Sequence, residues 1–168
     1  MSNDIPDGVA GVFETASAFE RTDDGFQSTT TPFEAAVTVT EGSTDWKHRY
    51  VVTIAVPGLD SATVDPVAEI VVTDWFETLE RRLEAAPGAT RASVELTEFA
   101  VERVDKAVHV EYVFEWGNPD SGVEIARTLI EYVEGTYVEG IIPGYDYQPP
   151  VSDLLSNASQ SGESGTPL

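Results

Sequence analysis

Few side chains in this sequence could carry out catalysis or bind a metal ion. The chain has no cysteine and only two histidines, His48 and His109. Alternating apolar residues place His48 on the apolar face of one strand and His109 on the polar face of another. Side chains on opposite faces of a sheet cannot share a metal ion or act as a catalytic pair. The sequence therefore predicts no catalytic residues, no metal site and no cofactor, with His48 partly buried and hydrogen-bonded and His109 at the surface.

The polar group of most chemical interest is Tyr145, Asp146 and Tyr147. In an extended segment the two tyrosines point to one side and Asp146 points to the other. Two interpretations stay open. Either the rings pack on the core and their hydroxyls reach backbone partners, or these side chains, together with His48, bind a ligand or act as general acids and bases in a pocket.

The surrounding stretch, "EYVEGTYVEGIIPGYDYQPP", contains Tyr-Val-Glu-Gly twice. Gly135 and Gly140 have the glycine spacing of a phosphate-binding P-loop, but two isoleucines stand where that loop needs Lys and Ser or Thr. We interpret Gly135 as the residue that ends a helix, and the Pro-Gly pair at 143–144 as the centre of a type II turn. Residues 135–150 are then expected to form an ordered flap over the core.

Hydrophobic periodicity predicts the element order α-β-β-β-α-β-β-α. Helices are expected at 6–19, at 65–86 and after the capping signal "GNPDS", where the buried stripe consists of Val123, Ala126, Leu129, Ile130, Val133 and Tyr137. Three strands are expected at 26–30, 33–40 and 46–56, the last with Trp46 and His48 on its apolar face. Two more strands flank the Asp105-Lys106 turn, the first with a bulge near Glu98.

Short links between consecutive strands imply antiparallel pairing. The expected fold class is therefore α+β, with an antiparallel five-stranded sheet and helices packed on one face. The element order resembles the layout of bacterial type III secretion chaperones, and a shared layout does not fix function. Residues 1–158 are expected to form a single globular domain, with a short helix at 151–158, and residues 159–168 a disordered C-terminal tail.

Charge is the strongest compositional signal. Thirty Asp and Glu face nine Lys and Arg, a formal net charge of -21. Such like charges repel one another in dilute buffer, whereas in about 1 M salt the Debye length falls to about 3 Å. An acidic surface around an ordinary core is typical of a protein from a salt-rich cytoplasm. Mimicry of nucleic acid, or a basic protein partner, is the alternative explanation of the charge.

The same composition disfavours two classes of partner. There is no basic cluster, so binding to nucleic acid is not expected. No segment approaches the roughly 18 uninterrupted apolar residues of a membrane span. The N-terminus lacks the pattern of a secretory signal, so we expect a cytoplasmic protein that does not contact membranes.

Several long phrases, "DWFETLERRLEAAPGATRA", "VFEWGNPD" and "EYVEGTYVEGIIPGYDYQPPV", with the terminal "GTPL", resemble an uncharacterised protein family of haloarchaea. The resemblance covers nearly the whole chain. It implies a haloarchaeal cytoplasmic protein, in agreement with the charge. It implies no activity and no catalytic residues.

Two classes of function follow from these observations. The favoured one is a non-enzymatic, chaperone-like module that binds another protein or a second copy of itself. Val67, Ile70 and Val71 lie off the apolar stripe of the 65–86 helix. Either this helix begins only near Asp74, with Glu77 completing a capping-box-like pair, or the three aliphatics meet a second surface and are the expected interface. The alternative is a small-molecule-binding protein or an enzyme with a pocket under the 135–150 flap.

Overall fold

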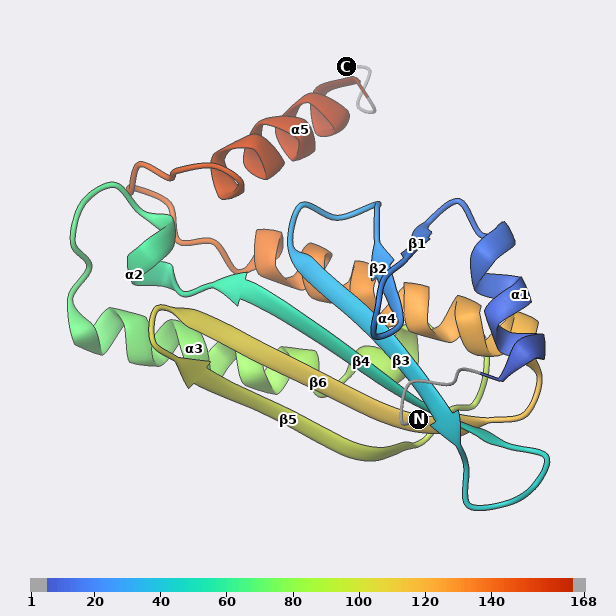
Figure 1. The fold of residues 1–168 in the computed structure, drawn as a ribbon. Coiled ribbons are helices and arrows are strands. Elements are labelled where there is room, and N and C mark those ends of the chain that lie inside the picture. The colour runs from blue at the N-terminus through green and yellow to red at the C-terminus, as the bar shows by residue number, and fades with distance from the viewer. Residues whose placement is uncertain (1–5, 165–168) are drawn as a thin grey trace.

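An antiparallel sheet is the frame on which the rest of the chain is arranged (Figure 1). The computed structural model describes residues 6–164. Six strands lie in the order β1-β2-β3-β4-β6-β5, and each is antiparallel to its neighbours. Their bounds are β1 Phe19–Arg21, β2 Phe26–Ser28, β3 Glu34–Glu41, β4 His48–Pro57, β5 Leu96–Val104 and β6 Ala107–Trp116.

The helices α3 and α4 cover one face of this sheet, the far side in Figure 1, whereas α1 lies beside β1. The longest, α4, contacts β4 and β6 and also α1 and α3. The inward-facing strand residues and these helices share one cluster of buried side chains. The predicted α+β class, with an antiparallel sheet, is confirmed. The bounds are α1 Asp7–Thr15, α2 Leu59–Ala62, α3 Glu69–Leu83, the 3-10 helix η1 Ala86–Ala89, α4 Pro119–Glu139 and α5 Val151–Ser164.

The helix α4 forms because a strong start signal precedes a regular apolar stripe. Asn118 Oδ1 accepts a hydrogen bond from Ser121 N at 3.0 Å, and Pro119 occupies the first helical position. Every residue of the predicted stripe is buried, including Tyr137. The stripe turns α4 toward the sheet and leaves its glutamates on the outer side.

The prediction that Gly135 ends this helix is wrong, because α4 continues to Glu139. A glycine inside a helix costs about 1 kcal/mol relative to alanine. The last turn of α4 carries Tyr137, whose fully buried ring meets those of Phe33 and Trp75 at centroid distances of 5.1 and 5.8 Å. These contacts outweigh the unfavourable helix propensity of Gly135. The predicted flap is therefore shorter than 135–150 and starts after the helix.

The prediction of five strands is wrong, because the segment 6–19 contains two elements rather than one helix. The helix α1 ends at Thr15, and the next residue has extended backbone angles (φ -79°, ψ 120°). Phe19 then begins β1 and packs edge-on against Phe13 of α1, with ring centroids 4.9 Å apart. After Thr15, Ala18 reaches the same core from a turn and Phe19 from a strand, which periodicity alone does not distinguish from a longer helix.

Two further boundaries differ from the prediction. The helix α3 begins at Glu69 and not at residue 65, since Ala68 is extended (φ -61°, ψ 139°). The strand β4 begins at His48, so Trp46 lies in the loop that joins β3 to β4 rather than on a buried face. Because it lies in this loop, Trp46 is exposed to solvent at the end of the sheet.

Other local predictions are confirmed. The irregularity in β5 lies between Leu96 and Glu98. Gly144 has a φ of 99°, which the third residue of a type II turn requires. The helix α5 runs from Val151 to Ser164, longer than the helix predicted at 151–158, so it overlaps the predicted tail 159–168. Residues 165–168 of that tail lie outside the described residues, and the single-domain extent 1–158 stays a prediction.

Candidate functional site

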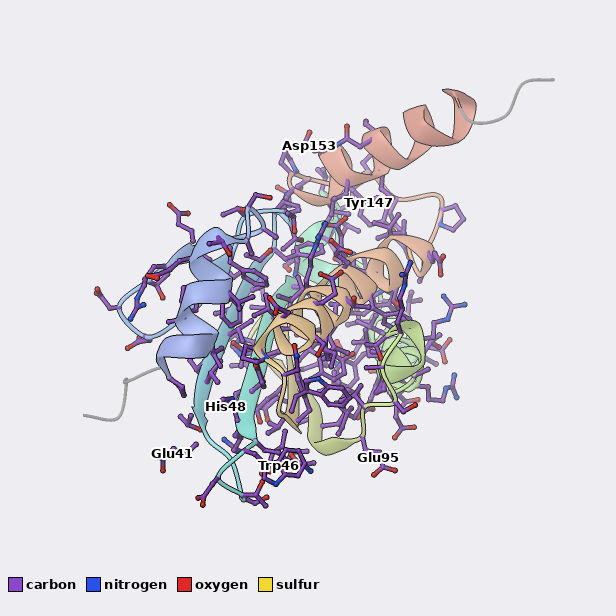
Figure 2. All side chains as sticks on the ribbon, turned by 90° about the vertical axis from the view of Figure 1, so that its right-hand side faces the viewer. Glu41, Trp46, His48, Glu95, Tyr147 and Asp153 are labelled. Carbon is purple, nitrogen blue, oxygen red and sulfur yellow. The ribbon has the colours of Figure 1, made fainter. Side chains whose placement is uncertain are left out.

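The structure does not bring together all the residues predicted to form a site. Figure 2 shows His48 and Tyr147 far apart, toward opposite ends of the molecule. His48 is the first residue of β4, whereas Tyr147 forms a bridge with Thr63, beyond the other end of that strand. A pocket that uses His48 together with the Tyr145–Tyr147 group is therefore not formed.

The Tyr145–Tyr147 group runs along the segment that follows α2. Val64 N donates to Asp146 O at 2.8 Å, and the Tyr147 hydroxyl donates to Ile142 O at 2.5 Å. Burial raises the pKa of Tyr147, and Asp146 is exposed. The backbone partner of the Tyr147 hydroxyl matches the first of the two interpretations of this group.

The two histidines occupy opposite faces of the sheet, as predicted. His109 is exposed on the face that no helix covers. His48 is partly buried, but its Nδ1 is buried without a hydrogen-bond partner among the described residues. The expectation that this histidine is hydrogen-bonded is thus wrong at that atom. Within residues 6–164, no group of three or more His, Asp or Glu is placed to hold a metal ion.

The predicted interface residues at the start of α3 have different environments. Val67 and Val71 are partly buried and pack against the core. Ile70 is 79% exposed. Two of the three aliphatics therefore have a partner within the chain, and Ile70 is the one that a second protein could contact fully.

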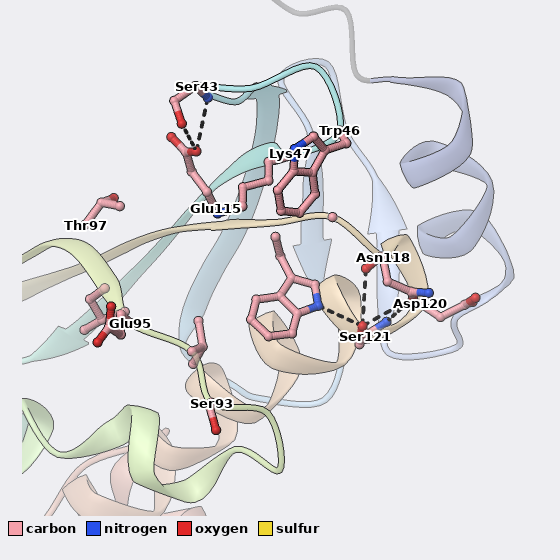
Figure 3. A pocket seen from close by; sticks show the side chains of 14 residues that line it. Ser43, Trp46, Lys47, Ser93, Glu95, Thr97, Glu115, Asn118, Asp120 and Ser121 are labelled. Carbon is pink, nitrogen blue, oxygen red and sulfur yellow. Dashed lines mark hydrogen bonds between the residues drawn. The ribbon is translucent and has the colours of Figure 1, made fainter.

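A hollow of about 1370 Å³ lies at the end of the sheet where three segments meet (Figure 3). The β3–β4 loop, the turn from β6 into α4, and residues 93–97 form its walls. Figure 3 shows Trp46 and Glu95 on opposite sides of this pocket. Pockets for small molecules usually measure about 300–1,000 Å³. This hollow is therefore large enough for a more extended ligand.

Trp46 is the aromatic side chain that the hollow exposes most, with 66% of its surface accessible. Its indole rests on Gly117, since a Cβ built at that glycine would lie 3.1 Å from Trp46 Cε3. The Nζ of Lys47 lies 4.8 Å from the centroid of the same ring, a cation–π contact. The ring is thus supported from one side, and it already accepts a cation.

Glu115 fixes the loop between β3 and β4. Its Oε1 accepts hydrogen bonds from Ser43 N at 3.1 Å and from Ser43 Oγ at 2.6 Å, drawn as dashed lines in Figure 3. These bonds, with smaller contributions from the charges of Lys47 and Arg49, hold the pKa of Glu115 below its usual range. Gly42 N also donates to Lys47 O at 3.0 Å and closes the loop. The loop is therefore organised before any ligand arrives.

The start of α4 forms a further wall, next to Trp46. Trp116 Nε1 donates to Ser121 Oγ at 2.8 Å, which satisfies this indole within the chain. The hollow is acidic, because three carboxylates line it against the single ammonium of Lys47. The three are Glu95, Glu115 and Asp120.

The lining residues favour binding over catalysis. Serines line the hollow, but no histidine is among its lining residues to activate one of them as a nucleophile. The carboxylate of Glu115 already accepts two hydrogen bonds from Ser43. What the hollow offers a ligand is an exposed indole, hydroxyl groups and an excess of negative charge.

Sequence reasoning did not find this site. The alternation of β4 continues in the sequence back to Trp46, so periodicity alone predicts that Trp46 faces the core, whereas the strand begins at His48. Glu115 is one of thirty Asp and Glu in the sequence, so its residue type alone does not indicate a site. One signal in the sequence was available. Trp46 directly follows the turn sequence "EGSTD", and a residue at that position can belong to the loop rather than to the buried face of the strand.

Residues 14–157 match the family of unknown function DUF5813. The match covers most of the 168 residues, so the chain belongs to this family, and the predicted membership of an uncharacterised family is confirmed. No curated protein and no solved structure matches the chain. Among the helices of residues 6–164, none combines the length and the apolar character that crossing a bilayer requires.

Proposed function

We propose that the protein is a non-enzymatic binding module, and that the hollow around Trp46 holds a basic segment of another polypeptide. The observation that carries the proposal is the indole of Trp46, two-thirds exposed on a loop held by Glu115. Binding energy at protein interfaces is concentrated in a few aromatic or arginine anchors. A fixed aromatic side chain loses little conformational freedom on binding, which favours affinity.

The size and charge of the hollow favour a basic polypeptide over a metabolite. Its volume of about 1370 Å³ exceeds that of usual small-molecule pockets. Its three carboxylates attract a cationic partner. The contact between Lys47 Nζ and the Trp46 ring supports the same conclusion, because a lysine or arginine of a partner could replace Lys47 over that ring.

A peptide selection tests this proposal. Random decapeptides are presented to the immobilised wild-type protein at the lowest KCl concentration that keeps it folded, because salt screens the attraction between carboxylates and a basic peptide. The retained peptides are sequenced. We expect enrichment of Lys and Arg next to apolar residues. Trp46→Ala should weaken the binding of a selected peptide by about 30-fold or more, as loss of an interface anchor does.

Ile70→Ala provides the matched control. Ile70 is also exposed and apolar, but it lies on α3, and it does not line the hollow. The proposal expects this variant to bind as the wild type does. Retention of peptides without basic enrichment, or equal binding by Trp46→Ala, would contradict it. A loss confined to Ile70→Ala would instead place the interface at the start of α3.

We also propose that the protein works in a salt-rich cytoplasm. The net charge of -21 supports a cytoplasm rich in salt, as expected of a haloarchaeal protein. A second copy of the chain is the other candidate partner, and sedimentation in multi-molar KCl would detect it. The predicted likeness to secretion chaperones was based on the element order α-β-β-β-α-β-β-α. The protein also contains β1, α2 and η1, so its element order differs from that one and does not support a chaperone function.

A further inference from the structure

Trp75 has an unusual environment on the buried side of α3. The side chain is only 5% exposed, and its ring meets that of Tyr137 edge-on, at a centroid distance of 5.8 Å. Its Nε1 is buried and has no hydrogen-bond partner among the described residues. Leaving a buried donor without an acceptor costs about 1–3 kcal/mol. The indole of Trp116, by contrast, donates to Ser121.

Trp75 also lines a cavity of about 180 Å³ between α3 and the end of α4. Leu79 and Ile142 contribute apolar surface, and Thr136 is a buried polar neighbour. A cavity of about 150 Å³ in another protein is large enough for benzene. This one therefore matches a ligand with the size of a single ring. No described residue supplies an acceptor for Nε1, and a ligand in the space that the indole lines could supply one.

Arg82 adds a positive charge at the same cavity. Its guanidinium forms no ion pair or hydrogen bond with any described residue, although the chain contains thirty Asp and Glu. Trp75 and Arg82 are seven positions apart, so they lie on the same face of α3. Side chains on a helix lean toward its N-terminus, which brings the long Arg82 side chain closer to the indole.

Asp74 lines the cavity too and would repel an anion placed beside it. It lies eight positions before Arg82, about 12 Å along the helix axis. The negative end of a ligand is therefore expected on the Arg82 side of the indole. If instead a positively charged group of the ligand lay beside Asp74, that group could not accept a hydrogen bond from the Trp75 N–H.

We propose that this cavity binds a small carboxylic acid whose body is about the size of one ring. A carboxylate oxygen accepts a hydrogen bond from Trp75 Nε1, the negative charge faces Arg82, and the ring packs against Leu79 and Ile142. This site is separate from the hollow around Trp46, and the proposal does not depend on the function assigned to that hollow. It also differs from the predicted pocket of Tyr145, Asp146 and Tyr147, none of which lines this cavity.

Three probes of similar size separate the contributions of the ring, the hydrogen-bond acceptor and the negative charge to binding. Benzoate has a ring, an acceptor and a charge; benzamide lacks the charge; benzene lacks the charge and the acceptor. Each is titrated into ¹⁵N-labelled protein at the lowest KCl concentration that keeps it folded. The measured signal is the indole N–H resonance of Trp75, with those of Trp46 and Trp116 as internal references. We expect benzoate to shift the Trp75 resonance downfield and to bind most tightly, followed by benzamide and then benzene.

Two variants complete the test. Trp75→Phe keeps an aromatic ring but removes the N–H, and it should weaken benzoate binding by about tenfold. Arg82→Gln should abolish the preference for benzoate over benzamide. Arg81→Gln is the matched control, since Arg81 is exposed on α3 and does not line the cavity, and it should bind benzoate as the wild type does. If Trp75→Phe does not fold, the three titrations of the wild type decide.

Two results would overturn the proposal. One is a Trp75 resonance that does not move with benzoate at tens of millimolar. The other is equal binding of benzoate and benzamide by the wild type, which would remove the carboxylate from the ligand class.

Discussion

The hydroxyl of Tyr50, on β4, lies directly against Gly122, in the first turn of α4. A Cβ built at Gly122 would overlap Tyr50 Oη and Cζ. The Tyr50 ring cannot move aside easily, because it is fully buried and stacked on Phe114 with a centroid distance of 4.8 Å. The small size of Gly122 thus sets how closely α4 approaches the sheet.

Two glycines of α4 should respond in opposite ways to the same substitution. Gly122→Ala is expected to lower the free energy of unfolding by about 1–3 kcal/mol, the usual cost of overpacking a core. Gly135→Ala should raise it by about 0.5–1 kcal/mol, since nothing lies within 4 Å of a Cβ at that position and the helix gains an alanine. Guanidinium chloride unfolding of both variants in a constant KCl concentration measures the two effects. A stabilised Gly122→Ala would show that α4 does not lie this close to β4.

Two buried tyrosines should also differ when each is changed to phenylalanine. The Tyr112 hydroxyl donates to Leu83 O at 2.7 Å, so Tyr112→Phe leaves that carbonyl unpaired and should cost about 1–3 kcal/mol. The Tyr50 hydroxyl has no partner among the described residues, so Tyr50→Phe should be neutral or stabilising by up to about 1 kcal/mol. Chemical unfolding at neutral pH compares them. A similar loss in both variants would mean that the Tyr50 hydroxyl does have a partner.

Alkaline pH provides an independent test of Tyr50. Burial raises the pKa of Tyr50 to about 12, whereas a tyrosine in the unfolded chain ionises near pH 10. The unfolded state therefore loses this proton first, and the stability that Tyr50 contributes is present below about pH 10 and lost as pH rises toward 12. Tyr50→Phe should lose less stability than the wild type over that range. Parallel curves for the two proteins would contradict the assignment.

Glu115 should control the β3–β4 loop at acid pH. Its pKa in the folded state is lowered, chiefly by the hydrogen bonds from Ser43. The stability that the contact contributes is therefore complete at neutral pH and declines below about pH 4.3, the ordinary value for Glu, whereas the contact itself is lost only as pH falls through the lower folded-state pKa. The amide resonance of Ser43 should titrate accordingly. In Glu115→Gln the carbonyl can still accept a hydrogen bond, but the titration should disappear. A Ser43 resonance that is flat in the wild type would rule out the contact.

Salt should stabilise the fold, because -21 net charges are brought together on folding. Repulsion between neighbouring carboxylates in water is about 1 kcal/mol per close pair, and salt screens it. The melting temperature should therefore fall as KCl is withdrawn. A triple variant, Glu77→Gln, Glu84→Gln and Glu139→Gln, removes three exposed charges that form no ion pair with a described residue. It should melt higher than the wild type in low salt, with the difference shrinking in multi-molar KCl. A wild-type melting temperature independent of KCl would refute this account of the charge.

The long elements were predictable because their side chains repeat with a single period. The α4 stripe and the alternation through Tyr50, Val52 and Ile54 each face one core, so periodicity and burial agree. The predicted ends of helices and strands were wrong where tertiary contacts outweighed the local conformational preference of the residues. Gly135 stays helical because Tyr137 packs beyond it, and β1 has only three residues, too few to show a period.

The candidate site was not predictable for a different reason. Its walls come from residues 43–47, 93–97 and 115–121, which pairing of the strands brings to one end of the sheet. Taken separately, Trp46, Glu115 and Asp120 are ordinary residues of a turn, a strand and a first helical turn. The same holds for the Trp75 cavity, whose signal is an indole N–H without an acceptor. Only coordinates can show that an acceptor is missing.

The strand order has a consequence for how the chain folds. The pairs β1–β2, β2–β3, β3–β4 and β5–β6 join neighbours in sequence and close over short loops, whereas β4 and β6 pair across the whole stretch that contains α2, α3, η1 and β5. Closing that large loop costs entropy before its contacts form, and non-local pairing of this kind slows folding. The first four strands and the β5–β6 hairpin are thus two locally closed units. We expect their joining along β4 and β6, with α4 packed across both strands, to be the slow step of folding, so that changes at this seam alter the folding rate more than changes within either unit.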